Sequence, residues 1–424
     1  MIAKVFLVNR GVNMGPNRRA RGLTGVALFT LALSAGARAT IQTSHSAGED
    51  EIVLGMSAAF SGPAAALGSD MRAGIIAALQ EANKAGGIHG RKLRLIALDD
   101  GYEPSRTAPN MRTLVADQHV VAVIGNVGTP TAVAAIPIAI ETKTPFVGAY
   151  TGAGVLRKAP PDHVVVNFRA SYAEEVGTMV DALITRAGLK PQEIAFFTQR
   201  DAYGDAGFSG GIAALHRHGL KDDTTIAHGR YERNTEVVEN ALADVLTAKT
   251  PPRAVIMVGA YKPCAKFIQL AKENQLHVTF LNVSFVGSGP LAAALGSDGE
   301  GVIVTQVVPH YISEVPLAAS YREALMAFVP DAKPGFGSLE GYTAARMLLT
   351  ALDKGPDAPD RASVIRSLEG LGKFDLGLGA PLELSPTEHQ ACHQVWPTVV
   401  RNGQVVPTSW EKLFPRSAAA GDSR

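Results

Sequence analysis

Short apolar runs alternate with longer amphipathic stretches along most of the chain from residue 51 onward. Ten runs have the length and the β-branched composition of buried strands. They lie at residues 52–60, 92–100, 120–126, 144–150, 163–170, 193–199, 224–231, 253–261, 278–287 and 301–309. Between the first two runs, Met71, Ile75 and Leu79 recur at helical spacing. This alternation predicts an α/β fold of doubly wound, mostly parallel sheets covered by helices, and ten strands favour two sheets.

The pattern changes near the C-terminus. Helical periodicity dominates from Pro316 to Gly372, and the segment "QVWPTVVRNGQVVP" at 394–407 predicts a hairpin with Asn402-Gly403 in a type I′ turn. We expect residues 416–424 to form a disordered tail. In doubly wound sheets a ligand binds beyond the carboxyl ends of the strands, which is where the glycine-containing turns of this chain fall.

The N-terminal 39 residues have the layout of a signal peptide. A stretch with basic and no acidic side chains precedes an apolar run from Leu23 to Ala35, and Ala37-Arg38-Ala39 follows as a cleavage site. About 20 apolar residues are needed to cross a bilayer, so the run is too short to be an anchor. No lipobox cysteine follows the run, and both Met1 and Met14 fit as the start. The leader therefore predicts an exported, soluble mature chain.

Charge and cysteine content narrow the possible functions. The chain has 40 basic and 39 acidic side chains, and removal of the six basic residues of the leader leaves 34 against 39, a net charge of about −5. A net-negative chain without a long basic run is a poor candidate for nucleic-acid binding. The two cysteines, Cys264 and Cys392, leave a disulfide open, because sequence spacing does not fix their geometry.

A glycine-spaced turn lies in "VVAVIGNVGTPTAVAAI" at 120–136, between a predicted strand and a predicted helix. Backbone N–H groups and the dipole at a helix N-terminus favour an anion there. The turn lacks the lysine that a P-loop needs for a triphosphate and offers Thr129 and Thr131 instead. It is therefore typical of a site for a smaller anion.

Three motifs match enzyme or cofactor patterns only formally. The strand that should run directly into Ser209 of "GFSGG" ends eight residues before Gly207, which favours a helix over a nucleophile elbow. "GSGPLA" at 287–292 lacks the acid about 20 residues later that a dinucleotide site needs. "HQACH" at 389–393 has no further cluster of ligands to complete a metal site. We therefore predict no catalytic residue, no cofactor and no metal.

Two tyrosines follow predicted strands directly. Tyr203 lies in "RDAYGDAG" and Tyr261 in "GAYKPCAKF". A tyrosine at a sheet edge can simply pack its ring and expose its hydroxyl. Two of them at equivalent ends of neighbouring strands favour one wall of a ligand cleft.

Several segments together resemble a known family. "AGGIHGRKLRLIALDD" at 85–100 is the most specific, and the resemblance continues through "IGNVGTPT", "YTGAGVLRK", "DAYGDAG", "VGAYKPCAKFI", "FVGSG" and "SLEGYTAARMLLTAL". The chain thus resembles, over nearly all of residues 51–412, the periplasmic branched-chain-amino-acid-type (Leu/Ile/Val-binding-protein-like) substrate-binding proteins of ABC transporters. The resemblance implies a type I bilobal fold with three crossovers. It places lobe I at 51–170 plus 311–372 and lobe II at 171–310 plus 373–415.

The resemblance also implies a function and a site. The protein would be a periplasmic monomer that captures a small carboxylate-bearing ligand, an amino acid or an organic or aromatic acid, by hinge closure and delivers it to an inner-membrane ABC permease. A ligand-sensing regulatory protein of the same fold is the alternative. The carboxylate would bind Thr129, Tyr150, Thr151 and Gly152, with Thr131 a weaker candidate; Tyr203 and Tyr261 would close over it, and Leu67 and Gly68 would lie at the entrance.

Two positions depart from the family pattern. Ser288 and Gly289 stand in the loop where amino-acid binders place an acid for the ammonium group, and Ser288 is included in the expected site. Because an unpaired buried ammonium is costly, either Asp201 or another acid replaces it or the ligand lacks an amine. Leu67 stands where some relatives have an aromatic ring. Both departures concern ligand identity and leave the expected fold unchanged.

Overall fold

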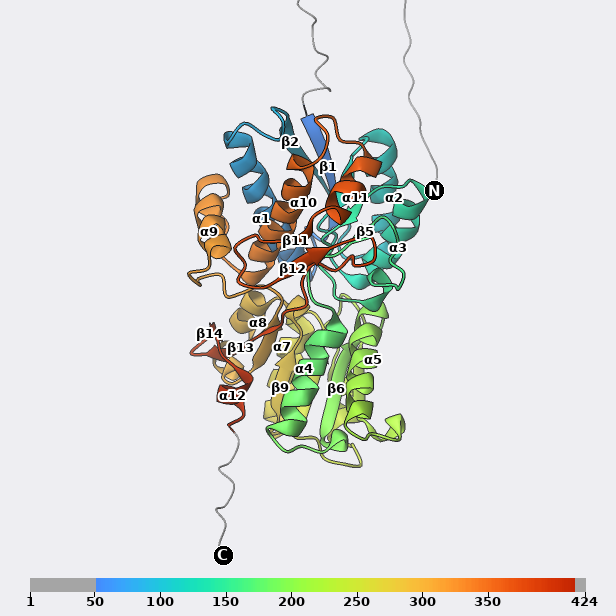
Figure 1. Cartoon of the computed structure of the whole chain (residues 1–424). Coiled ribbons are helices and arrows are strands. Elements are labelled where there is room, and N and C mark those ends of the chain that lie inside the picture. The colour runs from blue at the N-terminus through green and yellow to red at the C-terminus, as the bar shows by residue number, and fades with distance from the viewer. Residues whose placement is uncertain (1–50, 416–424) are drawn as a thin grey trace, which may run out of the picture. The chain divides into compact units, whose positions relative to one another are not determined.

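A computed structural model describes residues 51–415 (Figure 1). The predicted signal peptide and the predicted C-terminal tail lie outside the described residues. None of the helices between residues 51 and 415 has the length and apolarity that a membrane span needs.

The first sheet contains five parallel strands in the order β2-β1-β3-β4-β5. Their bounds are β1 Glu51–Ala58, β2 Lys92–Asp99, β3 Ala122–Ile124, β4 Phe146–Val147 and β5 Val165–Val166. All five predicted runs in this half are strands, although β4 and β5 are shorter than their apolar runs. The reversal of strand order around β1 is typical of a doubly wound sheet.

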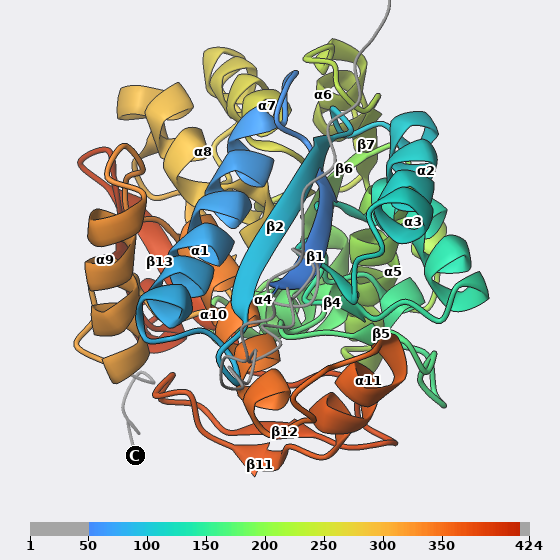
Figure 2. The same cartoon turned by 90° about the horizontal axis from the view of Figure 1, so that it is seen from above.

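Helices cover both faces of this sheet. Their bounds are α1 Ala65–Lys84, α2 Pro104–Arg112, α3 Thr129–Glu141, α9 Pro316–Phe328, α10 Phe336–Asp353 and α11 Arg361–Glu369. Figure 2 shows α1, α9 and α10 on one side of β1 and β2 and α2 and α3 on the other. The predicted helical region 316–372 is thus confirmed, and it packs against α1 far from it in sequence.

The second sheet has seven strands in the order β14-β13-β10-β9-β8-β6-β7. Their bounds are β6 Ile194–Gln199, β7 His228–Tyr231, β8 Ala254–Val258, β9 Thr279–Asn282, β10 Ile303–Gln306, β13 Trp396–Arg401 and β14 Gln404–Pro407. The hairpin β13–β14 adds antiparallel strands to an otherwise parallel sheet. Asn402 and Gly403 have φ of 50° and 72°, as the predicted type I′ turn requires.

The remaining helices surround this second sheet. Their bounds are α4 Tyr172–Thr185, α5 Ala202–Arg217, α6 Glu239–Leu246, α7 Tyr261–Glu273, α8 Ser288–Leu295 and α12 Trp410–Leu413. Every residue of β6 and β8 is buried, as expected for central parallel strands covered on both faces. A small sheet of β11 Gly372–Phe374 and β12 Leu382–Leu384 was not predicted.

The chain passes three times between the layers of the two sheets. These passages lie between β5 and α4, between β10 and α9, and between α11 and β13. Two sheets joined in this way, each with helices on both faces, match the predicted type I bilobal architecture. The functional question is therefore what the elements at the carboxyl ends of the parallel strands place between them.

Candidate functional site

The glycine-spaced turn after β3 leads directly into α3, as the sequence predicts. Gly128 is the N-cap residue with φ of 100°, and a Cβ atom there would lie 2.1 Å from Cε2 of Tyr102. Glycine is therefore needed both for the backbone conformation and for the close packing of the Tyr102 ring. The turn places Thr129 as the first residue of α3.

Thr129 and Thr151 face each other at this helix end. Their Oγ1 atoms are 2.7 Å apart, and both side chains are buried. Thr131, the weaker candidate, donates instead to the carbonyl oxygens of Val127 and Gly128, at 2.5 and 2.9 Å. Its hydroxyl is thus turned back onto its own helix and away from the threonine pair.

A third hydroxyl group lies beside this pair. The Tyr172 ring packs so closely on Gly152 that a Cβ atom there would lie 2.7 Å from Cδ1 of Tyr172. The Tyr172 hydroxyl lies beside the Thr151 side chain, but its buried oxygen makes no hydrogen bond of normal geometry among the described residues. Burial raises the pKa of this phenol to about 12, so it remains a hydrogen-bond donor at neutral pH.

The two predicted wall tyrosines follow neighbouring strands, β6 and β8. The Tyr203 hydroxyl donates to the carbonyl oxygen of Gly259 at 3.3 Å, and Asp201 caps the helix by accepting from the Tyr203 backbone N–H at 3.0 Å. Tyr261 is the first residue of α7 and is also largely buried. The strand-end positions are as predicted, but the hydroxyl of Tyr203 is used by the backbone.

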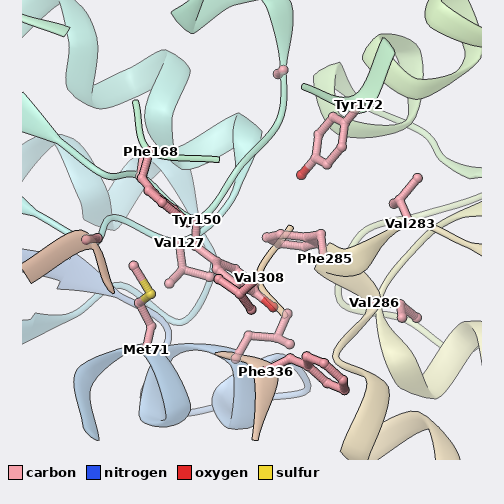
Figure 3. Close-up of a cluster of buried hydrophobic side chains, with 14 of the residues drawn as sticks. Met71, Val127, Tyr150, Phe168, Tyr172, Val283, Phe285, Val286, Val308 and Phe336 are labelled. Atoms are coloured by element: carbon pink, nitrogen blue, oxygen red, sulfur yellow. The ribbon is translucent and has the colours of Figure 1, made fainter. Parts of the chain in front are cut away.

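Phe285 occupies the space between the predicted ligand residues, and the sequence analysis missed it. It lies in the short 3-10 helix η5 (Ser284–Val286) after β9 and is fully buried. Its ring centroid is 4.6 Å from that of Tyr203, 5.4 Å from that of Tyr150 and 6.0 Å from that of Tyr102. Figure 3 shows the Phe285 ring beside Tyr150. In this conformation an aromatic side chain from one half of the molecule therefore packs among tyrosines of both halves.

Arg169 is a second residue that the sequence does not single out, because it lies near the end of the predicted strand run "HVVVNFRA". Its buried guanidinium lies on the first passage between the sheets, 3.4 Å from Glu175 and 3.6 Å from Glu340. It also donates to Ser284 Oγ and lies 4.9 Å from the Tyr150 ring centroid. The sequence does contain one signal for this residue, since a basic side chain within an apolar strand run indicates a buried charge that needs a partner.

The charges in this cluster shift the pKa values of one another. Burial favours the neutral form of Arg169, but Glu340 and Glu175 outweigh it and raise the pKa of the guanidinium. Burial raises the pKa of Glu340 to about 7, although Arg169 opposes that shift. One arginine with two carboxylates at the passage between the sheets is a positioning network. Nε and Nη1 of Arg169 are nevertheless buried without a hydrogen-bond partner in the described residues.

Five of the predicted ligand residues line a cavity, and they divide between two cavities, whereas Thr151, Tyr203 and Tyr261 line neither. Leu67, Tyr150 and Ser288 line one of about 580 Å³. Thr129 and Gly152 line another of about 770 Å³, between α3, α4 and α5. Gly68 has a packing role, because a Cβ atom there would lie 1.9 Å from the carbonyl oxygen of Ala59.

The acid proposed as a replacement at the family's ammonium position is already engaged. Asp201 accepts hydrogen bonds from Gln199 at 2.7 Å and from Arg233 at 3.1 Å. Ser288 Oγ accepts from Gln306 at 2.7 Å. Asp70, on α1, lines the same 580 Å³ cavity as Ser288.

The motifs judged formal from the sequence have ordinary structural roles. Ser209 lies inside α5, as the strand-to-helix spacing indicates. His389 contacts Val165 O at 2.9 Å and Glu369 at 3.2 Å, and residues 51–415 contain no group of three ligands suited to a metal ion. Cys264 and Cys392 are both buried free thiols, so the disulfide that the sequence left open is not formed between them in this structure.

Comparison with known proteins assigns the family. A family model described as "Periplasmic binding protein" matches residues 51–404. A solved structure of a possible leucine/isoleucine/valine-binding protein from Rhodopirellula baltica SH 1 is 50% identical, has a TM-score of 0.83, and the match covers 87% of this chain and 99% of that chain.

Curated relatives agree with this assignment. Leu/Ile/Val-binding protein homolog 7 of Brucella abortus is 24% identical over 380 residues, covering 84% of this chain and 88% of that protein. The leucine-, isoleucine-, valine-, threonine-, and alanine-binding protein of Pseudomonas aeruginosa is 24% identical over 324 residues, covering 74% and 81%. The chain therefore belongs to the periplasmic binding proteins, the family that includes the Leu/Ile/Val-binding proteins.

Proposed function

We propose that this periplasmic binding protein captures a small carboxylate-bearing solute by hinge closure and delivers it to an inner-membrane ABC permease. The observation that carries the proposal is a set of three buried hydroxyls near the start of α3, those of Thr129, Thr151 and Tyr172, which we call the hydroxyl cluster. The site acts by binding alone, and the relatives are likewise named as binding proteins.

The hydroxyl cluster favours an anionic ligand for two reasons. The N-terminus of the 13-residue helix α3 carries a partial positive charge, which is most effective within the first turn. A buried hydroxyl donor without an acceptor, such as that of Tyr172, costs about 1 to 3 kcal/mol, and a carboxylate oxygen would remove that cost. Threonine and tyrosine hydroxyls can each donate to one carboxylate without adding a charge of their own.

Contacts between the two halves support closure as the mechanism. Gln199 donates to the Tyr102 hydroxyl at 3.1 Å, and the Tyr150 hydroxyl donates to Ser284 O at 3.4 Å. Phe285 comes from the layers of the second sheet, whereas Tyr102 and Tyr150 come from those of the first. Opening of the two halves would therefore withdraw the Phe285 ring from Tyr150 and expose the hydroxyl cluster to solvent. Closing would exclude water from the bound ligand.

The three passages between the sheets are the natural hinge. We propose that residues 51–170 plus 311–372 move as one lobe and 171–310 plus 373–415 as the other. The protein would act as a monomer, without nucleic acid, in the periplasm after removal of residues 1–39. The relatives' names support the ligand class, because leucine, isoleucine and valine all carry a carboxylate.

Calorimetric titration of ligand-stripped mature protein tests the proposal. The panel contains aliphatic and aromatic amino acids, the corresponding acids without the amine, a neutral sugar and a nucleotide. We expect a carboxylate-bearing member to bind with a Kd in the micromolar range or below, and the primary amide of that ligand to bind much more weakly. Tight binding of the sugar or the nucleotide, with no carboxylate bound, would contradict the proposal.

A further inference from the structure

The 580 Å³ cavity contains a carboxylate that has no partner in the described part of the chain. Asp70 projects from the second turn of α1, and no hydrogen bond or ion pair acts on its side chain; burial is the one cause that shifts its pKa, to about 6. Within residues 51–415 the fully buried carboxylates are paired or hydrogen-bonded, as Asp100 is by Ser57 and Thr107, whereas Asp70 is partly buried and unpaired. Because a desolvated carboxylate without a partner is costly, we expect Asp70 to have a partner that the described chain does not supply.

The surroundings of Asp70 are those of a ligand cavity. Leu67, Tyr150, Tyr311 and Phe336 line it with apolar surface and phenol groups, and Ser288 lies on the opposite half. Two more charged side chains, Asp331 and Lys333, also line the cavity but are exposed to solvent. A partly buried carboxylate among aromatic rings, in a cavity whose one basic lining residue is the exposed Lys333, favours a cationic group on a molecule that enters the cavity.

We infer that Asp70 is the receptor for an ammonium group on the ligand, so that the solute carries an amine as well as a carboxylate. This inference rests on the proposed function. The loop after β4 contributes to both parts of this proposed site, because Tyr150 lines the Asp70 cavity and directly precedes Thr151 of the hydroxyl cluster in the chain. The Asp70 carboxylate would accept a charge-assisted hydrogen bond from the ammonium.

A structural role for Asp70 is the competing explanation. Gly337, in the first turn of α10, is so close that a Cβ atom there would lie 3.1 Å from Cβ of Asp70. A carboxylate near a helix N-terminus can stabilise that helix without any ligand. Such a role would affect the affinity for every ligand equally, whereas an ammonium receptor affects only ligands that carry an amine.

The experiment compares matched ligand pairs on mature wild-type protein, Asp70→Asn and the control Asp331→Asn, an exposed acid of the same cavity. The pairs are leucine and 4-methylpentanoate, phenylalanine and 3-phenylpropanoate, and γ-aminobutyrate and butyrate. For at least one pair we expect the wild type to bind the amine member about tenfold or more tightly than its partner, as a charge-assisted hydrogen bond allows. Asp70→Asn should abolish that preference, and Asp331→Asn should retain it.

Three other outcomes would overturn the inference. In the first, the wild type binds the acids without an amine as tightly as the amino acids, which leaves the proposed carboxylate function intact. In the second, Asp70→Asn weakens both members of a pair equally, which assigns Asp70 the structural role at α10. In the third, no member of any pair binds, and then the proposed function fails together with the inference.

Discussion

At the scale of single residues, the threonine pair at the start of α3 is the most specific part of the proposed site. Replacing Thr129 by Val keeps the shape of the side chain and removes its hydroxyl, so the loss of one buried hydrogen bond to the ligand should weaken binding by about 1 to 3 kcal/mol. Thr142→Val, at the C-terminal end of the same helix, is the matched control and should bind normally. Calorimetry of both variants measures the difference, and an unchanged affinity for Thr129→Val would remove this turn from the site.

The raised pKa of Asp70 also predicts how the free energy of unfolding depends on pH. Its pKa is raised by burial from 3.8 to about 6, so the folded protein holds this proton more tightly than the unfolded chain does. The free energy of unfolding contributed by Asp70 therefore falls as the pH rises from about 4 to 6 and stays low above that range. The free energy of unfolding of Asp70→Asn, measured with urea, should therefore rise relative to that of the wild type as the pH increases from 4 to 7. A constant difference across that range would show that Asp70 does not carry the proton.

The place of a residue in the fold could be predicted from the sequence where the local chain carries the signal, whereas its role in ligand binding stays a prediction. Thr129 follows a glycine turn and starts a helix, and Tyr203 and Tyr261 follow strands, so their places depend on local order alone. The positions of Phe285 and Arg169 depend on contacts with residues more than 100 positions away. No periodicity in the sequence encodes such contacts.

At the scale of elements, the short helix η5 is the segment that fills the predicted site. Phe285→Ala should destabilise the protein by about 3 to 5 kcal/mol, because a fully buried aromatic ring is lost. Phe414→Ala, near the C-terminal end of the described chain and only partly buried, should cost much less. Denaturant unfolding checks both values.

The same substitution should alter ligand selection. Removing the Phe285 ring opens space beside Tyr150 and Tyr203, so bulkier carboxylates should bind more tightly relative to small ones than they do in wild type. An unchanged order of affinities across the titration panel would place the ligand away from η5.

Strand and helix prediction worked for most of the fold, and its failure has a local cause. Each parallel strand is a nearly continuous apolar run bounded by turn residues, which makes it visible in the sequence. The unpredicted pair β11–β12 is only three residues long on each side, and Lys373 and Glu383 lie at its centre. Such a segment has too few apolar residues for a strand signal.

At the scale of the whole molecule, a polar contact at the rim joins the two halves. Arg233 and Asn234, after β7, donate to Glu103 at the start of α2, at 2.8 and 2.6 Å. If this contact stabilises the closed form, Glu103→Gln should weaken ligand binding by roughly two- to fivefold, since a partly exposed ion pair is worth up to about 1 kcal/mol. The loss should appear mainly as faster dissociation in stopped-flow measurements.

The neighbouring surface pair gives the control for this rim contact. Glu232 pairs with Arg200 at 2.8 Å within the second half alone, with both side chains more than half exposed. Glu232→Gln should therefore leave the dissociation rate unchanged. Equal effects of the two substitutions would mean that general surface charge, and not closure, controls ligand release.

The most direct test of the account is a crystal structure of the mature protein with the tightest carboxylate binder from the titration panel. We predict that the ligand lies between the two halves, with a carboxylate oxygen within about 2.7 to 3.2 Å of the hydroxyls of Thr129, Thr151 or Tyr172. A ligand bound on an outer face, or one between the halves with its carboxylate directed to solvent and away from these hydroxyls, would contradict the account.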